Sequence, residues 1–238
     1  MKRKMFAKVL ACLVSLSFSG TASATLLKFN ATNLGVSAGG TFDSVGMTVD
    51  GISVTISAYT IDNDGIGNIS SQSLLSGGRG VYVSSLTSTS RSGNLGVRSN
   101  TSGDGKDLDA GSTLSDLDEG LLFSFNQRIS LDYINFDSFG SGDDFNLTVD
   151  GVRVLWDHNA NDSSPLVTNV PGEFDEYNFN GITGEKFLVW ADGSSDSFRI
   201  DRVEVSPAPV PEPGTIILMG SGLAGLAFVR LRKKKADK

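Results

Sequence analysis

Residues 48–58 read Thr48-Val49-Asp50-Gly51-Ile52-Ser53-Val54-Thr55-Ile56-Ser57-Ala58. From Ile52 to Ala58, apolar residues occupy every second position, which is the period of a β-strand with one buried face. Asp50-Gly51 lies between β-branched residues and is typical of a two-residue type I′ turn, because both central positions of that turn need positive φ. The segment therefore predicts a β-hairpin whose second strand is half-buried.

A second segment of the same kind is Thr148-Val149-Asp150-Gly151-Val152, and it predicts a second hairpin. The two segments are either an internal repeat or one favourable hairpin used twice. The similarity between their flanks fades within a few residues, which favours the second interpretation.

Short alternating segments, separated by Gly, Ser, Asn and Asp, recur along the rest of the chain. They cover residues 26–29, 81–83, 121–125, 129–136, 145–149, 152–156, 187–190 and 198–205. Helical periodicity is nearly absent, so the crossovers of a parallel α/β fold are missing. We expect an all-β protein, an antiparallel β-sandwich of jelly-roll or immunoglobulin-like type. Residues 84–118 are either a long surface loop or a set of marginal strands.

The two ends of the chain differ from this body in composition. We expect five segments: a signal peptide at 1–24, the β-sandwich at 25–206, a proline-rich linker at 207–215, a transmembrane segment at 216–229 and a basic cytoplasmic tail at 230–238. The linker is predicted because prolines at every second position from Pro207 to Pro213 hold the chain extended.

The N-terminal segment has the three regions of a secretory signal. Basic residues are followed by an apolar run at 9–18 and by the small-residue cleavage site formed by Ala22 and Ala24. The alternative is a lipoprotein signal at Cys12, but the apolar run continues past that residue. Cleavage after Ala24 would leave a mature protein without cysteine, which excludes disulfides and thiol catalysis.

The C-terminal segment has three parts in a fixed order. The motif Val210-Pro211-Glu212-Pro213 precedes 14 uncharged residues, and a basic cluster follows: Arg230, Arg232, Lys233, Lys234 and Lys235. As a helix the uncharged run would be about 21 Å long, so it is a marginal anchor for a hydrocarbon core of about 30 Å. The basic cluster predicts that the C-terminus stays cytoplasmic and the body lies outside.

This tail resembles the PEP-CTERM sorting signal of Gram-negative bacteria. The resemblance implies processing by an exosortase, a transient intermediate in the inner membrane, and delivery to the cell surface or extracellular matrix. Residues 198–205 look like the usual last strand of family members with β-sandwich bodies. The Leu-Pro-x-Thr-Gly motif of Gram-positive wall sorting is missing. A membrane-anchored protein that is never cleaved is the alternative.

The charge of the body limits its partners. Residues 25–210 hold 25 acidic residues, 20 of them Asp, against 10 basic residues. A body with this balance repels nucleic acid and anionic lipid, so we expect neither as a partner of the folded domain. It suits an extracellular domain or one that binds cations.

Calcium is the cation that the Asp-rich segments would bind, because Ca²⁺ prefers oxygen ligands. The candidate ligands are Asp62, Asp64 and Asn68 in one cluster, Asp104, Asp107 and Asp109 in a second, and Asp116, Asp118 and Glu119 in a third. The first cluster is not a complete EF-hand, since Ser73 stands where that loop needs Glu. A solvated turn is the alternative for each cluster.

The residues of catalytic sites are scarce. His158 is the only histidine, and we expect it in a polar loop at 156–162. Serine-type catalysis needs a histidine base, and a zinc site needs more ligands than one histidine supplies. Paired carboxylates, which glycoside hydrolysis needs, are unavoidable among so many acidic residues. Their presence therefore does not distinguish a glycosidase from a protein without activity. We therefore expect no enzymatic activity.

Carbohydrate is the remaining class of ligand that the sequence suggests. Trp156 and Trp190 stand beside polar residues that could bind sugar hydroxyls, and a role in the core is the alternative for both. We expect an exported structural or adhesive protein that associates with exopolysaccharide or a surface glycan. A carbohydrate-binding module and a polysaccharide-active enzyme are the alternatives.

Overall fold

The structure is a computed structural model of the chain. It describes residues 23–63, 69–84, 87–88, 91–92, 94–99, 107–109, 118–159, 161–170, 173, 175–191 and 196–208. The chain divides into two units, Met1–Pro207 and Ala208–Lys238.

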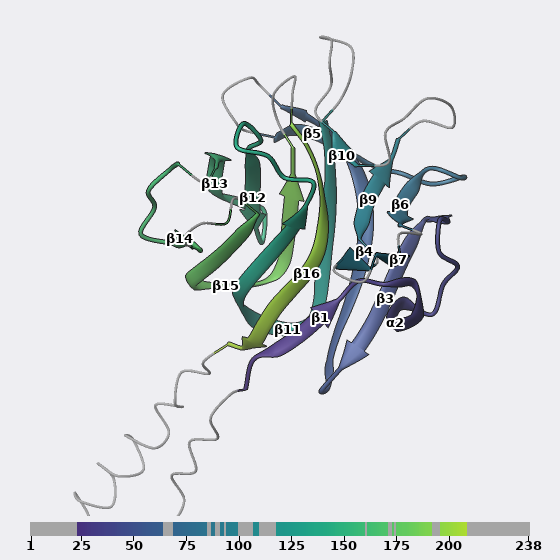
Figure 1. Cartoon of the computed structure of the whole chain (residues 1–238), viewed down its shortest axis with the longest axis horizontal. Helices are drawn as coiled ribbons and strands as arrows, with labels where there is room; N and C mark the ends of the chain where they lie inside the picture. The colour runs from purple at the N-terminus through teal and green to yellow at the C-terminus, as the bar shows by residue number, and fades with distance from the viewer. Residues whose placement is uncertain are drawn as a thin grey trace, which may run out of the picture. The chain divides into compact units, whose positions relative to one another are not determined.

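The first unit is built almost entirely from antiparallel strands (Figure 1). The strands are β1 Thr25–Lys28, β2 Thr41–Phe42, β3 Ser44–Val49, β4 Ile52–Asn63, β5 Ile69–Leu74, β6 Gly80–Val83, β7 Thr87–Ser88, β8 Arg91–Ser92, β9 Leu95–Arg98, β10 Leu108–Asp109, β11 Asp118–Asp137, β12 Phe145–Val149, β13 Val152–His158, β14 Val167–Asn169, β15 Glu176–Trp190 and β16 Ser197–Pro207. One short helix, α2 Ala31–Leu34, follows β1. The predicted all-β antiparallel class is confirmed, and the β-sandwich of jelly-roll or immunoglobulin-like type stays a prediction.

Both predicted Asp-Gly hairpins are confirmed. β3 pairs with β4 around Asp50 (φ 51°) and Gly51 (φ 81°), and β12 pairs with β13 around Asp150 (φ 50°) and Gly151 (φ 81°). The positive φ of all four residues is what a type I′ turn requires, and Asp and Gly adopt it at low cost.

The alternation of apolar residues from Ile52 to Ala58 is confirmed in β4. Ile52, Val54, Ile56 and Ala58 are buried, while the residues between them are exposed or half-buried. This strand pairs along one edge of the N-terminal half of β11, where Val54 lies opposite Phe125. A strand that buries one face needs this period, because successive side chains point to opposite faces of a sheet.

The two longest strands change partners along their length. β11 pairs with β4 and β15 up to Phe125, and with β15 and β16 from Ile129 onward. A break in register between Ser124 and Ile129 separates the two halves. β15 pairs with β14 through its first part and with β12 through its last part. Bulges allow such bends, because extra residues leave the ladder and re-aim the strand.

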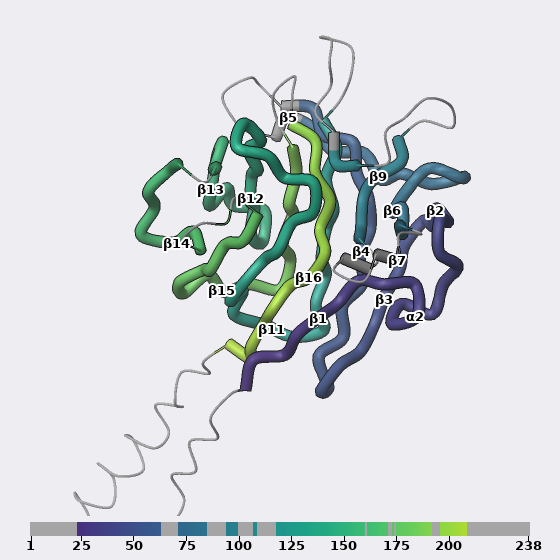
Figure 2. Tube along the Cα trace, in the orientation of Figure 1, coloured from purple at the N-terminus to yellow at the C-terminus, as the bar shows by residue number. Residues whose placement is uncertain are grey.

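The first and last strands of the body lie side by side (Figures 1 and 2). β1 runs antiparallel to β16, with Thr25 opposite Val205 and Lys28 opposite Arg202. The body therefore begins and ends at neighbouring strands, and both ends are held by backbone hydrogen bonds.

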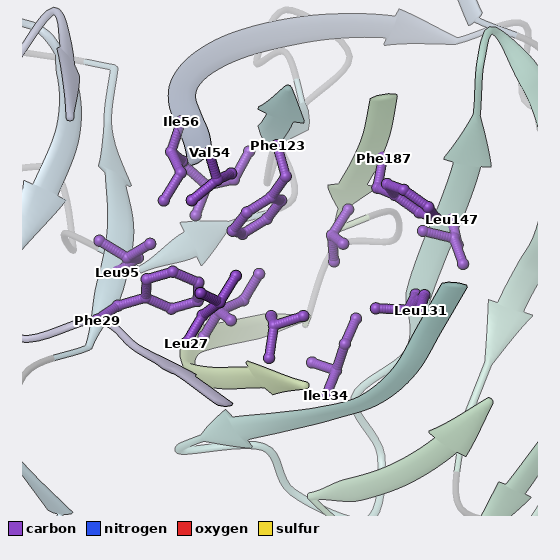
Figure 3. Close-up of a cluster of buried hydrophobic side chains, with 14 of the residues drawn as sticks. Leu27, Phe29, Val54, Ile56, Leu95, Phe123, Leu131, Ile134, Leu147 and Phe187 are labelled. Carbon is purple, nitrogen blue, oxygen red and sulfur yellow. The ribbon is translucent and has the colours of Figure 1, made fainter. Parts of the chain in front are cut away.

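The core contains aliphatic and aromatic side chains from most strands. Figure 3 shows Leu27 and Phe29 together with Val54, Ile56 and Phe123 in one part of this cluster. At another part, aromatic rings pack around Phe136, whose centroid lies between 4.9 and 5.7 Å from four others: Phe139, Phe145, Tyr177 and Phe198. These stacked, edge-on and tilted contacts add to the free energy gained by burial.

Most strands lie where alternation and turn residues predict them, and several short elements do not. Each alternating segment overlaps a strand, but α2, β2, β5 and β14 were not predicted. Helix α2 depends on its caps, since Asn30 Oδ1 accepts the N–H of Asn33 at 2.8 Å and Gly35 has φ 67°. Where residues 84–118 are described, they contain the short strands β7, β8, β9 and β10.

Candidate functional site

His158 lies in the core and not in a loop. The prediction of a polar loop at 156–162 is wrong for residues 156–158, which form the end of β13. Asp157 has φ 50°, and the register between β12 and β13 shifts at this position so that His158 lies opposite Phe145. A bulge of this kind turns the next side chain inward. His158 is 4% exposed.

The surroundings of His158 keep its imidazole neutral at neutral pH. The ring lies 5.6 Å from Phe145 and 5.8 Å from Tyr177, measured between centroids. Burial lowers the pKa of His158, and the nearby carboxylates of Asp162 and Asp144 only partly oppose this shift. A neutral, enclosed imidazole suits packing better than proton transfer with a substrate.

Four carboxyl groups lie near one another, and we call them the Asp196 cluster; one of them, Asp144, also lies near His158. Asp143 and Asp144 precede β12, Asp157 belongs to β13, and Asp196 precedes β16. Asp196 is 4% exposed, and its Oδ1 accepts the N–H of Asp144 at 3.1 Å. Burial and then the neighbouring carboxylates raise the pKa of Asp196 to about 7, against the lowering effect of this hydrogen bond.

Most of the predicted calcium ligands do not form a site in the described part of the chain. Asp62 is an exposed residue of β4 opposite Ser71. Asp107 forms an ion pair with Arg199 and accepts a hydrogen bond from Ser197. Asp109 lies in β10, Asp118 and Glu119 are buried in β11, and Asp64, Asn68, Asp104 and Asp116 lie outside the described residues.

A metal site is not assembled from the side chains that can be placed. Among the described residues, no group of three or more His, Cys, Asp or Glu side chains is arranged to hold a metal ion. Calcium binding therefore stays a prediction, which depends on the predicted ligands outside those residues.

The two tryptophans contact each other, and one of them is inaccessible. Trp190 is completely buried with Ile61 and Leu188. Trp156 is half-buried, and its ring lies 5.8 Å from that of Trp190 and 5.5 Å from the guanidinium carbon of Arg153. A buried ring has no face free for a sugar, so Trp190 has the core role that was the alternative. Glycan contact by Trp156 stays a prediction.

A polar network that sequence reasoning missed crosses β11, β15 and β16. Arg202 Nη2 donates to Tyr133 Oη and to Glu176 Oε1, both at 3.1 Å, and its guanidinium carbon lies 5.5 Å from the centre of the Tyr133 ring. Asn135 also donates to Glu176 Oε1, at 3.4 Å. Burial raises the pKa of Tyr133 to about 12, so the phenol stays protonated at physiological pH.

The chemistry of this network is that of polar recognition. Half-buried donors and acceptors are fixed around one aromatic ring, an arrangement that can bind sugar hydroxyls. The one sign of it in the sequence is the alternation of residues 198–205, which puts Arg202 on the face opposite Val203. Its partners are distant in sequence, so spacing alone could not identify them.

Ala24 is exposed and directly precedes β1, and the other predicted processing residues lie outside the described part of the chain. They are Ala22, Val210, Pro211, Glu212, Pro213 and the basic residues from Arg230 to Lys235. Among the described residues, no helix is long and apolar enough to cross a membrane.

Comparison with known families identifies the tail. Residues 209–233 match the family model of the PEP-CTERM protein-sorting motif. The chain carries a PEP-CTERM sorting signal. The match covers the Pro-Glu-Pro motif, the uncharged segment and the start of the basic cluster, which are the three parts that carried the resemblance. A PEP-CTERM signal indicates an exported protein that is sorted by an exosortase.

The comparisons give no relative for the body. No curated protein and no solved structure matches the chain. The PEP-CTERM match begins at residue 209 and does not include the β body. The role of the body must therefore be argued from its own residues.

Proposed function

We propose that this protein is an exosortase substrate whose β body has a structural or adhesive role at the cell surface or in the exopolysaccharide matrix. The observation that carries the proposal is the PEP-CTERM match at residues 209–233. The tail delivers the protein through an inner-membrane intermediate, and the body is what remains after sorting. The proposal assigns the body no catalytic role.

The composition and the core of the body support a non-enzymatic role. The only histidine is buried among aromatic rings, where its imidazole stays neutral. The single cysteine, Cys12, lies in the predicted signal peptide. The body therefore has no cysteine nucleophile, and its one histidine is enclosed and poorly placed to act as a base.

Contact with exopolysaccharide is supported by the outward polar network of Tyr133, Glu176 and Arg202. An arginine held by a carboxylate over an aromatic ring presents donors to anionic or neutral sugars. The excess of Asp would couple such a body to anionic polysaccharide through divalent cations. A carbohydrate-binding module is the second candidate, and the Tyr133 network is the observation that favours it.

The sorting step is tested by replacing Pro211, Glu212 and Pro213 together with alanine in the full-length chain. A chain without the motif should accumulate in the membrane fraction at its unsorted mass, because the enzyme that reads the motif no longer processes it. Immunoblots of membrane, cell-surface and medium fractions measure this distribution.

Thr215→Ala is the matched control, since it changes the same linker outside the Pro-Glu-Pro motif and should leave sorting intact. Release of the triple variant at the normal rate and mass would show that the motif does not direct sorting, and the proposed function would be lost.

A further inference from the structure

We propose that Asn180-Gly181 in β15 is a site of spontaneous covalent modification, at which the folded body slowly exchanges a side-chain amide for a carboxylate. The backbone nitrogen of Gly181 attacks the side-chain carbonyl carbon of Asn180 in this reaction. The inference goes beyond the proposed function, because it concerns a chemical change of the body that needs no enzyme and no cofactor.

The sequence singles out this pair of residues. Asn180 is the only asparagine in the chain that glycine follows. The reaction requires the backbone nitrogen of the following residue to reach the asparagine side chain. A side chain on the following residue obstructs this approach, whereas glycine has no Cβ and the widest choice of backbone conformations. Asn180 is therefore the asparagine whose successor hinders the reaction least.

The fold leaves both residues accessible. Asn180 and Gly181 are exposed, although they lie between two buried residues of the same strand, Phe179 and Ile182. Neither residue has a partner in the described ladders that β15 forms with β11, β12 and β14. Gly181 has φ 74°, so the chain leaves the extended conformation at this point. The pair therefore lies in an exposed irregularity of a strand that is otherwise well anchored.

Other exposed asparagines lack this combination of features. The side chain of Asn126 is engaged, because its Oδ1 accepts the N–H of Ser53 at 2.9 Å. Asn178 is exposed in the same strand as Asn180, but Phe179 follows it. Phe179 is buried and pairs with Val167 of β14. Asn178 is thus an internal control that differs in its successor and in the pairing of that successor.

The reaction balances with water as the only other reactant. The Gly181 nitrogen forms a bond with Cγ of Asn180, and its proton leaves with the side-chain nitrogen as ammonia. Water then opens the resulting cyclic imide at one of its two carbonyl groups. One product has aspartate at position 180, and the other has an isoaspartyl link, in which the backbone runs through the former side chain. Because the attacking nitrogen must lose its proton, the rate should rise with pH.

The modification acts where β14 is attached to β15. The backbone N–H of Asn180 donates to the carbonyl oxygen of Leu166 at 2.8 Å, and Phe179 pairs with Val167. The pairing of β15 with β11 resumes at Ile182. An isoaspartyl link lengthens the backbone between these two sets of contacts, and both products add a negative charge at the exposed surface.

The test is tandem mass spectrometry of peptides from the full-length protein after incubation at pH 8.5 and at pH 5.5. Digestion at acid pH prevents further reaction during preparation. At pH 8.5, Asn180 should be converted about tenfold faster than Asn178, because the paired successor of Asn178 must first leave its strand. Conversion of Asn180 should be slower at pH 5.5. Equal rates at Asn178 and Asn180 would contradict the proposal.

A second measurement separates the effect of the fold from that of the dipeptide. The rate at Asn180 in the folded protein should lie within about tenfold of its rate in the urea-unfolded chain. Conversion that occurs only after unfolding would overturn the proposal, because the fold would then protect the site.

Asn180→Gln removes the reaction, since its longer side chain cannot close the five-membered ring. Asn178→Gln is the matched control, and both positions are exposed, so neither variant alters the buried face of β15. During incubation at pH 8.5, anion-exchange chromatography should show an acidic form that grows in the wild type and in Asn178→Gln. Most of this form should be lost in Asn180→Gln. Equal growth in the two variants would refute the assignment to Asn180.

Discussion

At the scale of single residues, Asp150 shows that a turn residue can have long-range partners. Its Oδ1 accepts the N–H of Glu185 at 3.0 Å and of Lys186 at 2.9 Å, and its Oδ2 lies 3.4 Å from Arg128 Nη1. The ion pair is exposed to solvent and contributes little, so the two backbone hydrogen bonds dominate. One carboxylate thereby fixes the β12–β13 turn against β15.

Asp150→Ala should lower the free energy of unfolding by about 2 kcal/mol more than Asp50→Ala, because it also removes two charge-assisted hydrogen bonds. Both residues have nearly the same positive φ, so the backbone cost to alanine cancels in the comparison. Urea unfolding of the two variants measures the difference. Equal losses in both would show that the carboxylate of Asp150 does not stabilise the fold.

At the scale of elements, β11 is the strand on which the body is assembled, and Gly120 is its tightest position. A Cβ at Gly120 would lie 2.6 Å from Ile61 Cδ1 and 2.9 Å from Trp190 Cβ. The backbone of β11 therefore approaches the small cluster of Ile61, Leu188 and Trp190 as closely as a glycine allows.

Gly120→Ala should destabilise the protein by about 2 kcal/mol, since the neighbouring buried side chains must shift to admit a methyl group. Gly142→Ala is the matched control, because a Cβ there meets no atom within 4 Å. Its free energy of unfolding should stay within about 0.5 kcal/mol of the wild type. Equal stability of the two variants would contradict the close approach at Gly120.

The elements also show which parts of the fold could be predicted from the sequence. Alternation and Asp-Gly turns are local properties, and they located β4, β12 and both hairpins. The continuity of β11 could not be predicted, because polar Asn126 and Arg128 in its bulge resemble a loop. In the structure Asn126 Oδ1 accepts the N–H of Ser53 at 2.9 Å, a partner 73 residues away.

The same distinction between local sequence patterns and tertiary contacts applies to the candidate sites. The sorting signal was predictable because a peptidase reads a linear motif, and residues 209–233 contain all of it. His158 was misplaced because its neighbours are polar and the bulge at Asp157 is a tertiary feature. Asp196 gave no sign in the sequence, since its burial depends on contacts with Asp144, 52 residues earlier.

At the scale of the whole molecule, the β body lies in the sequence between a predicted signal peptide and a PEP-CTERM sorting signal. β1 begins at Thr25, directly after the predicted signal cleavage, and pairs with β16, which ends at Pro207. Removal of both ends would therefore leave the paired strands of the body complete. The central claim is that the two ends are processed and the body is delivered outside the cell.

The mass of the mature protein recovered from the cell surface or culture medium tests this claim most directly. Intact-mass spectrometry should show a chain that begins at Thr25 and has lost the residues that follow its sorting motif. Recovery of the whole chain from the cytoplasm, with Met1 and Lys238 both retained, would contradict it.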